Sequence, residues 1–183
     1  MGELARITVE ELVAHHVGGY LKVAPEHTER HVLDAMMKPP IECYETFQQA
    51  FDRFSKAHGK KQYLIPYFMA AHPGTRTEDM IALALWLKRH HIRPDQVQTF
   101  LPAPMAIATA MYATGIDPRY PLQGEPKTIE TVRKERERRI QKAFLRAHDP
   151  SNWPLIQETL LRMGRSDLIG KGPNHLVPPQ APR

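Results

Sequence analysis

Ionisable and small residues gather in three short segments that each follow an apolar run. The segments are "PEHTERH" (25–31), "HPGTRTED" (72–79) and "PAPMAIAT" (102–109). His27 and His72 carry imidazoles, which exchange protons near neutral pH. Pro-Gly turns also join strands to helices in ordinary connections, so the segments by themselves fit either a ligand site or plain connection.

Metal chemistry finds little support in the sequence. His27 and His31 have the i, i+4 spacing that brings two imidazoles to one helix face, but no third ligand accompanies them. Cys43 is the single cysteine, which excludes an intrachain disulfide and a cysteine cage and favours a structural thiol. We therefore predict no metal site in this chain.

The apolar runs that precede the three segments predict strands over 20–24, 62–71 and 95–102. Helical spacing predicts helices over 28–37, along the aromatic stripe from Tyr44 to Phe54, and over 77–91. Alternating strands and helices indicate a parallel sheet, whose strands end at one shared edge where ligands bind. Pro66 opposes the second strand because proline donates no ladder hydrogen bond. Three strands make a small sheet, so the pattern resembles part of a larger α/β barrel or sheet.

Charge divides the chain in two. Residues 1–122 hold 13 Lys/Arg and 13 Asp/Glu, whereas residues 123–183 hold 12 Lys/Arg against 7 Asp/Glu, so the net charge of +5 lies in the last third. We predict a boundary there, followed by helices over 127–147 and 151–164 and a frayed Pro-rich end, "PNHLVPPQAPR".

The segment "RKERERR" (133–139) mixes both signs at helical spacing, which is more typical of a solvated helix face than of a nucleic-acid contact. No apolar run approaches the roughly 20 residues that span a bilayer, and the first residues lack a signal-peptide pattern. The sequence thus predicts a cytoplasmic protein without a membrane partner.

Four longer stretches carry a family resemblance. They are "LKVAPEHTERHVLDAMMKP", "QYLIPYFMAAHPGTRTEDMIALALWLK", "DQVQTFLPAPMAIATAMYATG" and "MGRSDLIGKGPNHLVP". The first three resemble the later half of the radical S-adenosylmethionine (SAM) domain of YgiQ-type proteins, and the fourth resembles the C-terminal end of those proteins. The likeness runs from about residue 6 to 178. It implies an α/β fold: a partial radical-SAM-type (β/α) barrel over 1–122, contributing the last three parallel strands, and a basic helical extension over 123–183.

The resemblance also implies cofactors. In that superfamily a CxxxCxxC loop holds a 4Fe-4S cluster that cleaves SAM reductively, and the resulting deoxyadenosyl radical abstracts hydrogen from a substrate. With one cysteine, this chain is not expected to hold the cluster alone. SAM and the cluster would belong to the complete protein, with the N-terminal half-barrel as the missing partner and catalysis a property of the whole.

The resemblance assigns residues one by one. "YFMAAHPGT" stands at the SAM-binding motif that follows the fifth strand; Tyr67 and Ala71 replace its glycines, Met69 its isoleucine, and Thr75 lies near its glutamate. The remaining SAM-side residues would be Glu26 near the ribose or amino-acid part, and Gln98, Phe100 and Leu101 beside the adenine. His27 and His72 would be the catalytic candidates on the substrate side.

Two other interpretations stay open. The chain is alternatively a basic interaction module whose last third binds RNA or an acidic protein partner. It is otherwise an inactive truncated product. The substrate is not specified by the residues or by the resemblance.

Overall fold

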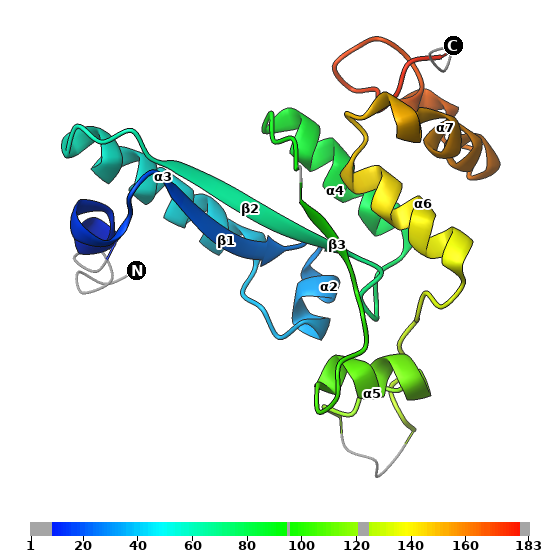
Figure 1. Cartoon of the computed structure of the whole chain (residues 1–183). Helices are drawn as coiled ribbons and strands as arrows, with labels where there is room; N and C mark the ends of the chain where they lie inside the picture. The colour runs from blue at the N-terminus through cyan, green and yellow to red at the C-terminus, as the bar shows by residue number, and fades with distance from the viewer. Residues whose placement is uncertain (1–8, 95, 121–124, 180–183) are drawn as a thin grey trace.

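The computed structural model describes residues 9–94, 96–120 and 125–179, and it shows an α/β fold (Figure 1). Its sheet has three parallel strands in the order β1 (Tyr20–Glu26), β2 (Tyr63–Ala70) and β3 (Val97–Thr99). The predicted class and parallel strand direction are confirmed. The sheet is open and does not close into a barrel, and β3 is shorter than the predicted 95–102.

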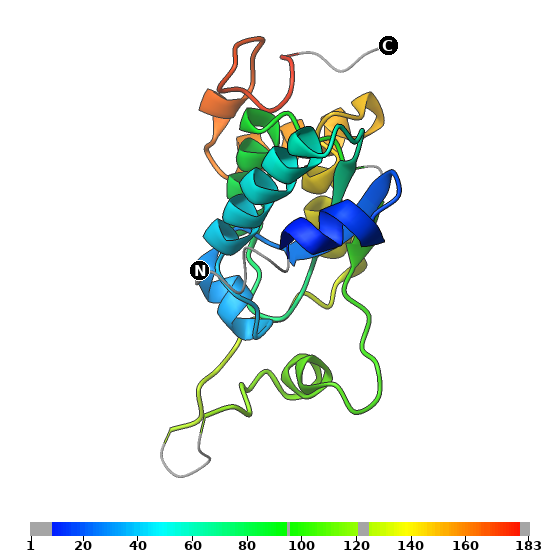
Figure 2. The same cartoon turned by 90° about the vertical axis from the view of Figure 1, so that its left-hand side faces the viewer.

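Helices connect and follow the strands. They are the π-turn η1 (Leu12–His16), α2 (Arg30–Ala35), α3 (Ile41–Ala57), α4 (Thr77–Arg89), α5 (Ile107–Thr114), α6 (Glu135–Leu145) and α7 (Trp153–Arg162), with short 3-10 turns η2 (Pro150–Asn152) and η3 (Ser166–Leu168). Figures 1 and 2 both place α5 away from the sheet, at the end of an extended connection.

Pro66 lies inside β2 without breaking it. It pairs with Val23 of β1, and β2 meets β3 only from Phe68 to Ala70. The proline therefore precedes the stretch of β2 that has a neighbour on each side. Its missing N–H costs the sheet little for that reason.

The helices cover one face of the sheet. Phe68 and Ala70 of β2 are buried with Leu83 of α4 and Phe144 of α6 in the main core. The predicted aromatic stripe of α3 builds a second cluster, in which Phe51 and Phe54 meet strand residues such as Leu64. Burial of these side chains supplies most of the driving force for the fold.

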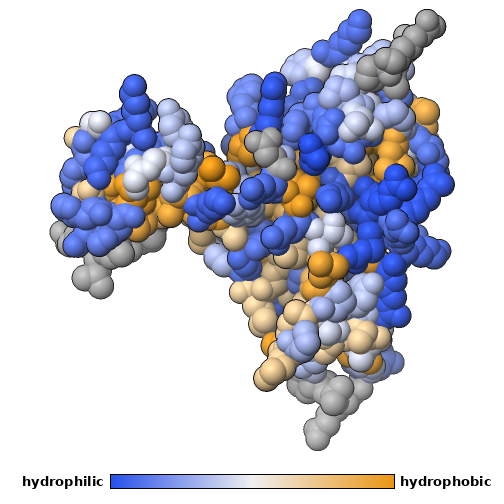
Figure 3. Space-filling model, viewed as in Figure 1, coloured by the Kyte–Doolittle hydropathy of each residue, from blue (hydrophilic) through white to orange (hydrophobic). Residues whose placement is uncertain are grey.

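Among the residues that the structure describes, no helix lies over the other face of the sheet. Tyr20 and Tyr63, opposite each other in the β1–β2 register, stack with ring centroids 5.8 Å apart, and the Tyr20 side chain remains 69% exposed. In the space-filling view of Figure 3, orange hydrophobic residues lie over the region of β1 and β2, interspersed with blue hydrophilic ones. In the described part of the chain, helices therefore cover β2 on one face only.

The charged helix is shorter than the predicted 127–147. Residues 127–134 are extended: Thr128 bridges Ile116, and the Ile129 N–H donates to the Gly115 carbonyl at 2.8 Å. The Glu130 carbonyl accepts from the Gly74 N–H at 2.7 Å. Contacts with the loop after β2 thus replace the first helical turns.

The last third is built into the same core. Phe144 of α6 and Ile156 and Leu160 of α7 are fully buried in the cluster that holds β2 and α4. The predicted boundary at 122/123 falls within 121–124, outside the described residues. The expected frayed end does not hold for residues 173–179, since Leu176 and Val177 are buried and Val177 bridges Ile169; residues 180–183 lie outside the description.

Within the described ranges, none of the helices has the length and apolar character needed to cross a membrane.

Candidate functional site

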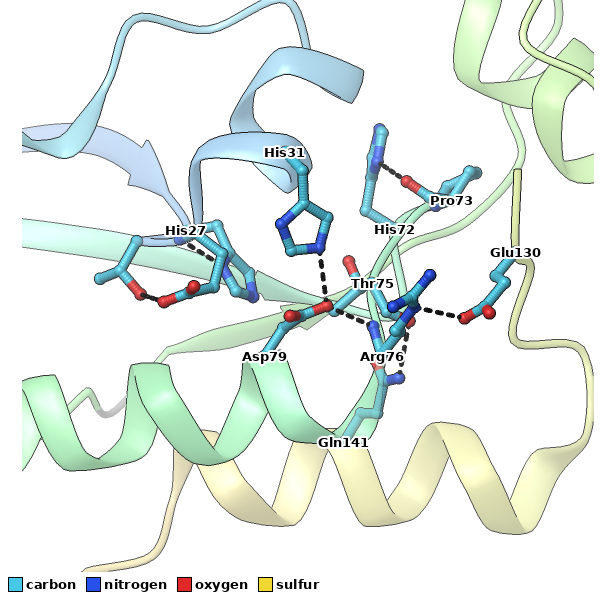
Figure 4. Close-up of polar contacts among 11 residues, drawn as sticks. His27, His31, His72, Pro73, Thr75, Arg76, Asp79, Glu130 and Gln141 are labelled. Atoms are coloured by element: carbon cyan, nitrogen blue, oxygen red, sulfur yellow. Dashed lines mark hydrogen bonds and ion pairs between the residues drawn. The ribbon is translucent and has the colours of Figure 1, made fainter. Parts of the chain in front are cut away.

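The carboxyl ends of β2 and β3 meet, as the parallel sheet predicts. The Phe100 N–H donates to the Ala70 carbonyl at 2.8 Å, which ties the residue after β3 to the end of β2. The His72 and Phe100 rings meet edge to face, with centroids 5.3 Å apart. The segment 72–79 therefore lies beside the end of β3 (Figure 4).

A hollow of about 500 Å³ opens at this edge, and we call it the rim hollow. It is lined by Met69, His72, Gln98, Thr99, Phe100 and Leu101. No side chain in this lining carries a permanent charge, and Leu101 is 76% exposed at the mouth. The structure thus brings together five of the residues that the sequence proposed for a ligand site.

The other proposed residues lie elsewhere. The Tyr67 hydroxyl donates to Gln96 Oε1 at 2.8 Å, toward the start of β3. Glu26 ends β1 in a left-handed conformation (φ 70°) and pairs with Lys38 at 3.4 Å. Thr75 is buried behind the rim, and its hydroxyl finds no hydrogen-bond partner among the described residues. None of these three lines the rim hollow.

His27 is fully buried at the end of β1. The Glu29 N–H donates to its Nδ1 at 3.1 Å, so Nε2 carries the proton of the neutral ring and has no partner. Burial, followed by repulsion from His31 and His72, lowers the pKa of His27 to about 3. His27 is therefore a neutral group and does not reach the rim hollow.

His72 is the histidine that lines the rim hollow. Its Nδ1 lies 2.8 Å from the Pro73 carbonyl, which only accepts, so Nδ1–H donates and Nε2 keeps its lone pair. Burial lowers the pKa of His72, although the hydrogen bond to Pro73 opposes that effect. A neutral ring with a basic Nε2 is suited to accept a proton or a hydrogen bond.

The amino end of α4 is already occupied by a carboxylate. Asp79 Oδ2 accepts from the Arg76 N–H at 2.7 Å and lies 3.1 Å from His31 Nε2 (Figure 4). An anionic ligand at this helix end would meet the Asp79 charge. The start of α4 therefore does not offer a free anion site.

Gln141 of α6 holds the turn after β2, a role that the sequence did not reveal. It is buried, its Oε1 accepts from the Ala71 N–H at 2.8 Å, and its Nε2 donates to the Thr75 carbonyl at 3.1 Å. Ala71 is left-handed (φ 60°), so this clamp supports a strained turn. The available signal was an uncharged amide on the apolar side of α6, between Ile140 and Phe144.

Metal ligands do not converge in the described part of the chain, where no group of three His, Cys, Asp or Glu could hold an ion. Cys43 is exposed near the start of α3. The chemistry that the site itself offers is thus polar and apolar contact around one neutral imidazole.

Comparison with known proteins shows homology over almost the whole chain. A UPF0313 protein of Pseudomonas aeruginosa is 60% identical over 174 residues, covering 95% of this chain and 23% of that protein. One from Rhodopseudomonas palustris is 59% identical over 175 residues, covering 95% and 26%. The UPF0313 protein YgiQ of Salmonella typhimurium is 54% identical over 170 residues, covering 93% and 24%.

This chain is homologous to the UPF0313 proteins, and it spans about a quarter of the length of these relatives. Residues 95–183 also match the family described as a domain of unknown function, DUF3362. No solved structure matches the chain.

Proposed function

We propose that this chain supplies part of the SAM and substrate pocket of a radical SAM iron–sulfur enzyme, whose catalysis requires the rest of a longer protein. The observation that carries the proposal is the rim hollow at the carboxyl edge of a parallel sheet, the edge where such folds bind ligands. The resemblance of the three strand-end segments to YgiQ-type radical SAM domains supports the same assignment.

The rim hollow suits the nucleoside end of SAM. Its volume of about 500 Å³ is in the range of small-molecule sites. Met69 and Phe100 would contact the adenine ring, and the exposed Gln98 amide and Leu101 backbone would give it polar partners. Glu26 and Thr75 are outside this set, because Glu26 pairs with Lys38 and Thr75 is buried.

The 4Fe-4S cluster does not fit this chain, because a single exposed cysteine cannot provide three thiolates. With such a cluster, SAM supplies a carbon radical that abstracts hydrogen. The cluster ligands would come from the remaining three quarters of the longer protein. Among the described residues β1 and β3 each pair with one neighbour only, and these open edges, together with the uncovered sheet face at Tyr20 and Tyr63, support further strands joining this sheet.

Within the pocket, the residues of this chain would bind and position. His72 would present its neutral Nε2 to a donor on the substrate or SAM. Phe100 packs against both His72 and Tyr112, with ring centroids 5.3 and 5.6 Å apart, and would keep this side of the pocket dry. The Gln141 clamp would hold the turn that carries His72.

Saturation-transfer NMR with SAM tests the proposal on the 183-residue chain. Protein protons are expected to transfer saturation to the adenine protons, and Leu101→Asp should abolish the transfer by placing a charge at the mouth of the rim hollow. Leu161→Asp is the matched control, since Leu161 is also exposed, at 61%, but lies on α7. Absence of transfer, or equal transfer in Leu101→Asp, would exclude this pocket.

Anaerobic iron–sulfur reconstitution tests the role of the missing part. The chain alone is expected to take up no stoichiometric cluster. A stoichiometric cluster with its visible absorption band would contradict the assignment of the cluster ligands to another segment.

A further inference from the structure

A second, larger hollow of about 1000 Å³ lies at the other end of the molecule, and we call it the distal hollow. It forms where the carboxyl end of α4, the α6–α7 junction and the C-terminal loop come together, at the top of Figure 1. The rim hollow lies beyond the opposite end of β3. The two sites therefore share no lining residue.

Three cations surround the distal hollow without partners. Arg89 ends α4, Arg93 follows that helix, Lys171 comes from the C-terminal loop, and all three are exposed. Among the described residues none of them forms an ion pair or a side-chain hydrogen bond, and the lining contains no Asp or Glu. A helix carboxyl end favours Arg89 by itself, but this dipole does not account for Arg93 or Lys171, which lie beyond the helix.

Most arginines elsewhere in the described part of the chain are paired, and Arg139 of α6 and Arg162 of α7 are exceptions. Ion pairs join Arg76 to Glu130, Arg119 to Asp117, Arg136 to Glu158, Arg146 to Asp149 and Arg165 to Asp167. Within "RKERERR", Arg133 and Arg138 donate to backbone carbonyls instead. Three unpaired cations thus gather at the distal hollow, and α6 keeps two, Arg139 and Lys142, outside it.

The outer wall of the distal hollow is a fixed loop. Lys88 of α4 donates to the Gly172 carbonyl at 3.3 Å and to the His175 carbonyl, and the Gly172 N–H donates to His175 Nδ1 at 2.9 Å. A Cβ on Gly170 would lie 2.5 Å from the His175 ring, so the loop needs glycine there. The hollow is therefore built by specific contacts.

The floor of the distal hollow is mostly aliphatic. Its apolar members include Ala84, Leu87, Leu176 and Val177. Phe144 is fully buried, and the Trp153 indole N–H donates to the Ala147 carbonyl at 2.9 Å. Nucleic acids bind by stacking bases on open aromatic faces, and this floor offers few of them.

We propose that the distal hollow docks an acidic peptide segment of a protein partner. Aliphatic side chains of the segment would rest on the floor, and its carboxylates would meet Arg89, Arg93 and Lys171. Guanidinium groups suit this task because they bind carboxylates through two parallel hydrogen bonds. The site would hold the chain to a partner while leaving the rim hollow open.

Fluorescence anisotropy with a labelled acidic peptide of repeated Leu-Glu-Glu-Leu units tests the proposal on the 183-residue chain. Arg93→Glu is expected to weaken binding about 10-fold, and Arg93→Glu with Lys171→Glu about 100-fold, since each step of about 1.4 kcal/mol is tenfold in affinity. Arg139→Glu is the matched control: Arg139 is an exposed, unpaired cation on α6 outside the distal hollow. It should change affinity less than about 2-fold.

A bulky substitution tests the contribution of the apolar floor independently of the cations. Ala147 is partly exposed in the lining, so Ala147→Phe should fill the hollow and prevent binding while the thermal unfolding temperature stays near that of the unaltered chain. Ala57→Phe, at an exposed position on α3, is its control.

Three results would overturn the proposal. One is equal loss of affinity in Arg93→Glu and Arg139→Glu. Another is equal binding of a peptide in which Gly replaces every Leu. The third is tighter, competing binding of a single-stranded oligonucleotide that depends on the same cations, which would make the hollow a nucleic-acid site.

Discussion

The rim hollow and the distal hollow differ in the charge of the side chains around them. At the rim, burial keeps His27 and His72 neutral, and the nearby charges of Arg76 and Asp79 are paired. At the distal hollow, exposed cations stay unpaired around an apolar floor. Desolvation is costly for buried ions and cheap for exposed ones, so the rim suits an uncharged part of a ligand, such as the proposed nucleoside end of SAM, and the distal hollow suits an anionic ligand.

Both sites depend on the last third of the chain. Gln141 of α6 clamps the turn at the rim, and residues 170–178 form a wall of the distal hollow. This part therefore works as an integral layer of the fold.

The largest effect is expected from removing the clamp at the rim. Gln141→Leu leaves the Ala71 N–H and the Thr75 carbonyl buried without partners, each costing about 1–3 kcal/mol, so the free energy of unfolding should fall by about 2–6 kcal/mol. Urea unfolding followed by circular dichroism measures the change. Gln49→Leu, at an exposed site on α3, is the control and should change the free energy of unfolding by less than about 0.5 kcal/mol. Equal urea midpoints for the two variants would show that Gln141 does not stabilise the turn.

Acid should destabilise the chain through the rim. The folded pKa of His27 is about 3, against 6.5 for a free imidazole, so the unfolded chain takes up the proton first. The free energy of unfolding should therefore fall as the pH drops from about 6.5 toward 3, by about 2 kcal/mol between pH 7 and 5. His72 acts in the same direction. Urea titrations at pH 7 and pH 5 should show a smaller decrease in the free energy of unfolding for His27→Asn than for the unaltered chain. An identical decrease would show that protonation of His27 is not the cause.

A smaller effect is expected from the wall of the distal hollow. Gly170→Ala forces the His175 ring away from the new Cβ and breaks its bond with the Gly172 N–H, which should lower the free energy of unfolding by about 1 kcal/mol. Binding of the acidic peptide should weaken in parallel. Gly18→Ala is the control, because a Cβ there meets nothing within 4 Å. Wild-type affinity in Gly170→Ala would show that the wall is not needed.

The smallest effect on stability should come from the free cations. Arg93→Gln is expected to change the free energy of unfolding by less than about 0.5 kcal/mol, because the side chain is exposed and unpaired. Arg119→Gln should cost about 3 kcal/mol, since it leaves the buried Asp117 carboxylate without its partner. Urea unfolding measures both changes. A similar decrease in the free energy of unfolding for the two variants would contradict the difference between paired and free cations.

Much of the fold could be predicted from local pattern. The strands ending near Glu26, Ala70 and Thr99 and the helices between them follow from apolar periodicity, and parallel pairing brings the segments after β2 and β3 to one edge. The segment 127–134 could not be predicted in this way. The spacing of its apolar residues favours a helix, but the segment instead forms hydrogen bonds with Gly74 and Gly115. These partners lie outside the segment, so its own residues do not predict them.

Part of the candidate site could also be predicted from the positions of residues at strand ends. Met69, His72, Gln98, Phe100 and Leu101 meet at the rim hollow because they lie at strand ends. Glu26, Tyr67 and Thr75 also lie near strand ends, yet their side chains are paired or buried elsewhere.

The sequence by itself determined the alternation of strands and helices, the excess of positive charge and the lack of cluster ligands, because each depends only on residue types and spacing. Only the tertiary structure decided which histidine is buried, which cations remain free and where the C-terminal loop lies. Gln141 illustrates the physical reason: it is 70 residues from Ala71 and 66 from Thr75, and only packing of α6 beside β2 brings its amide to both.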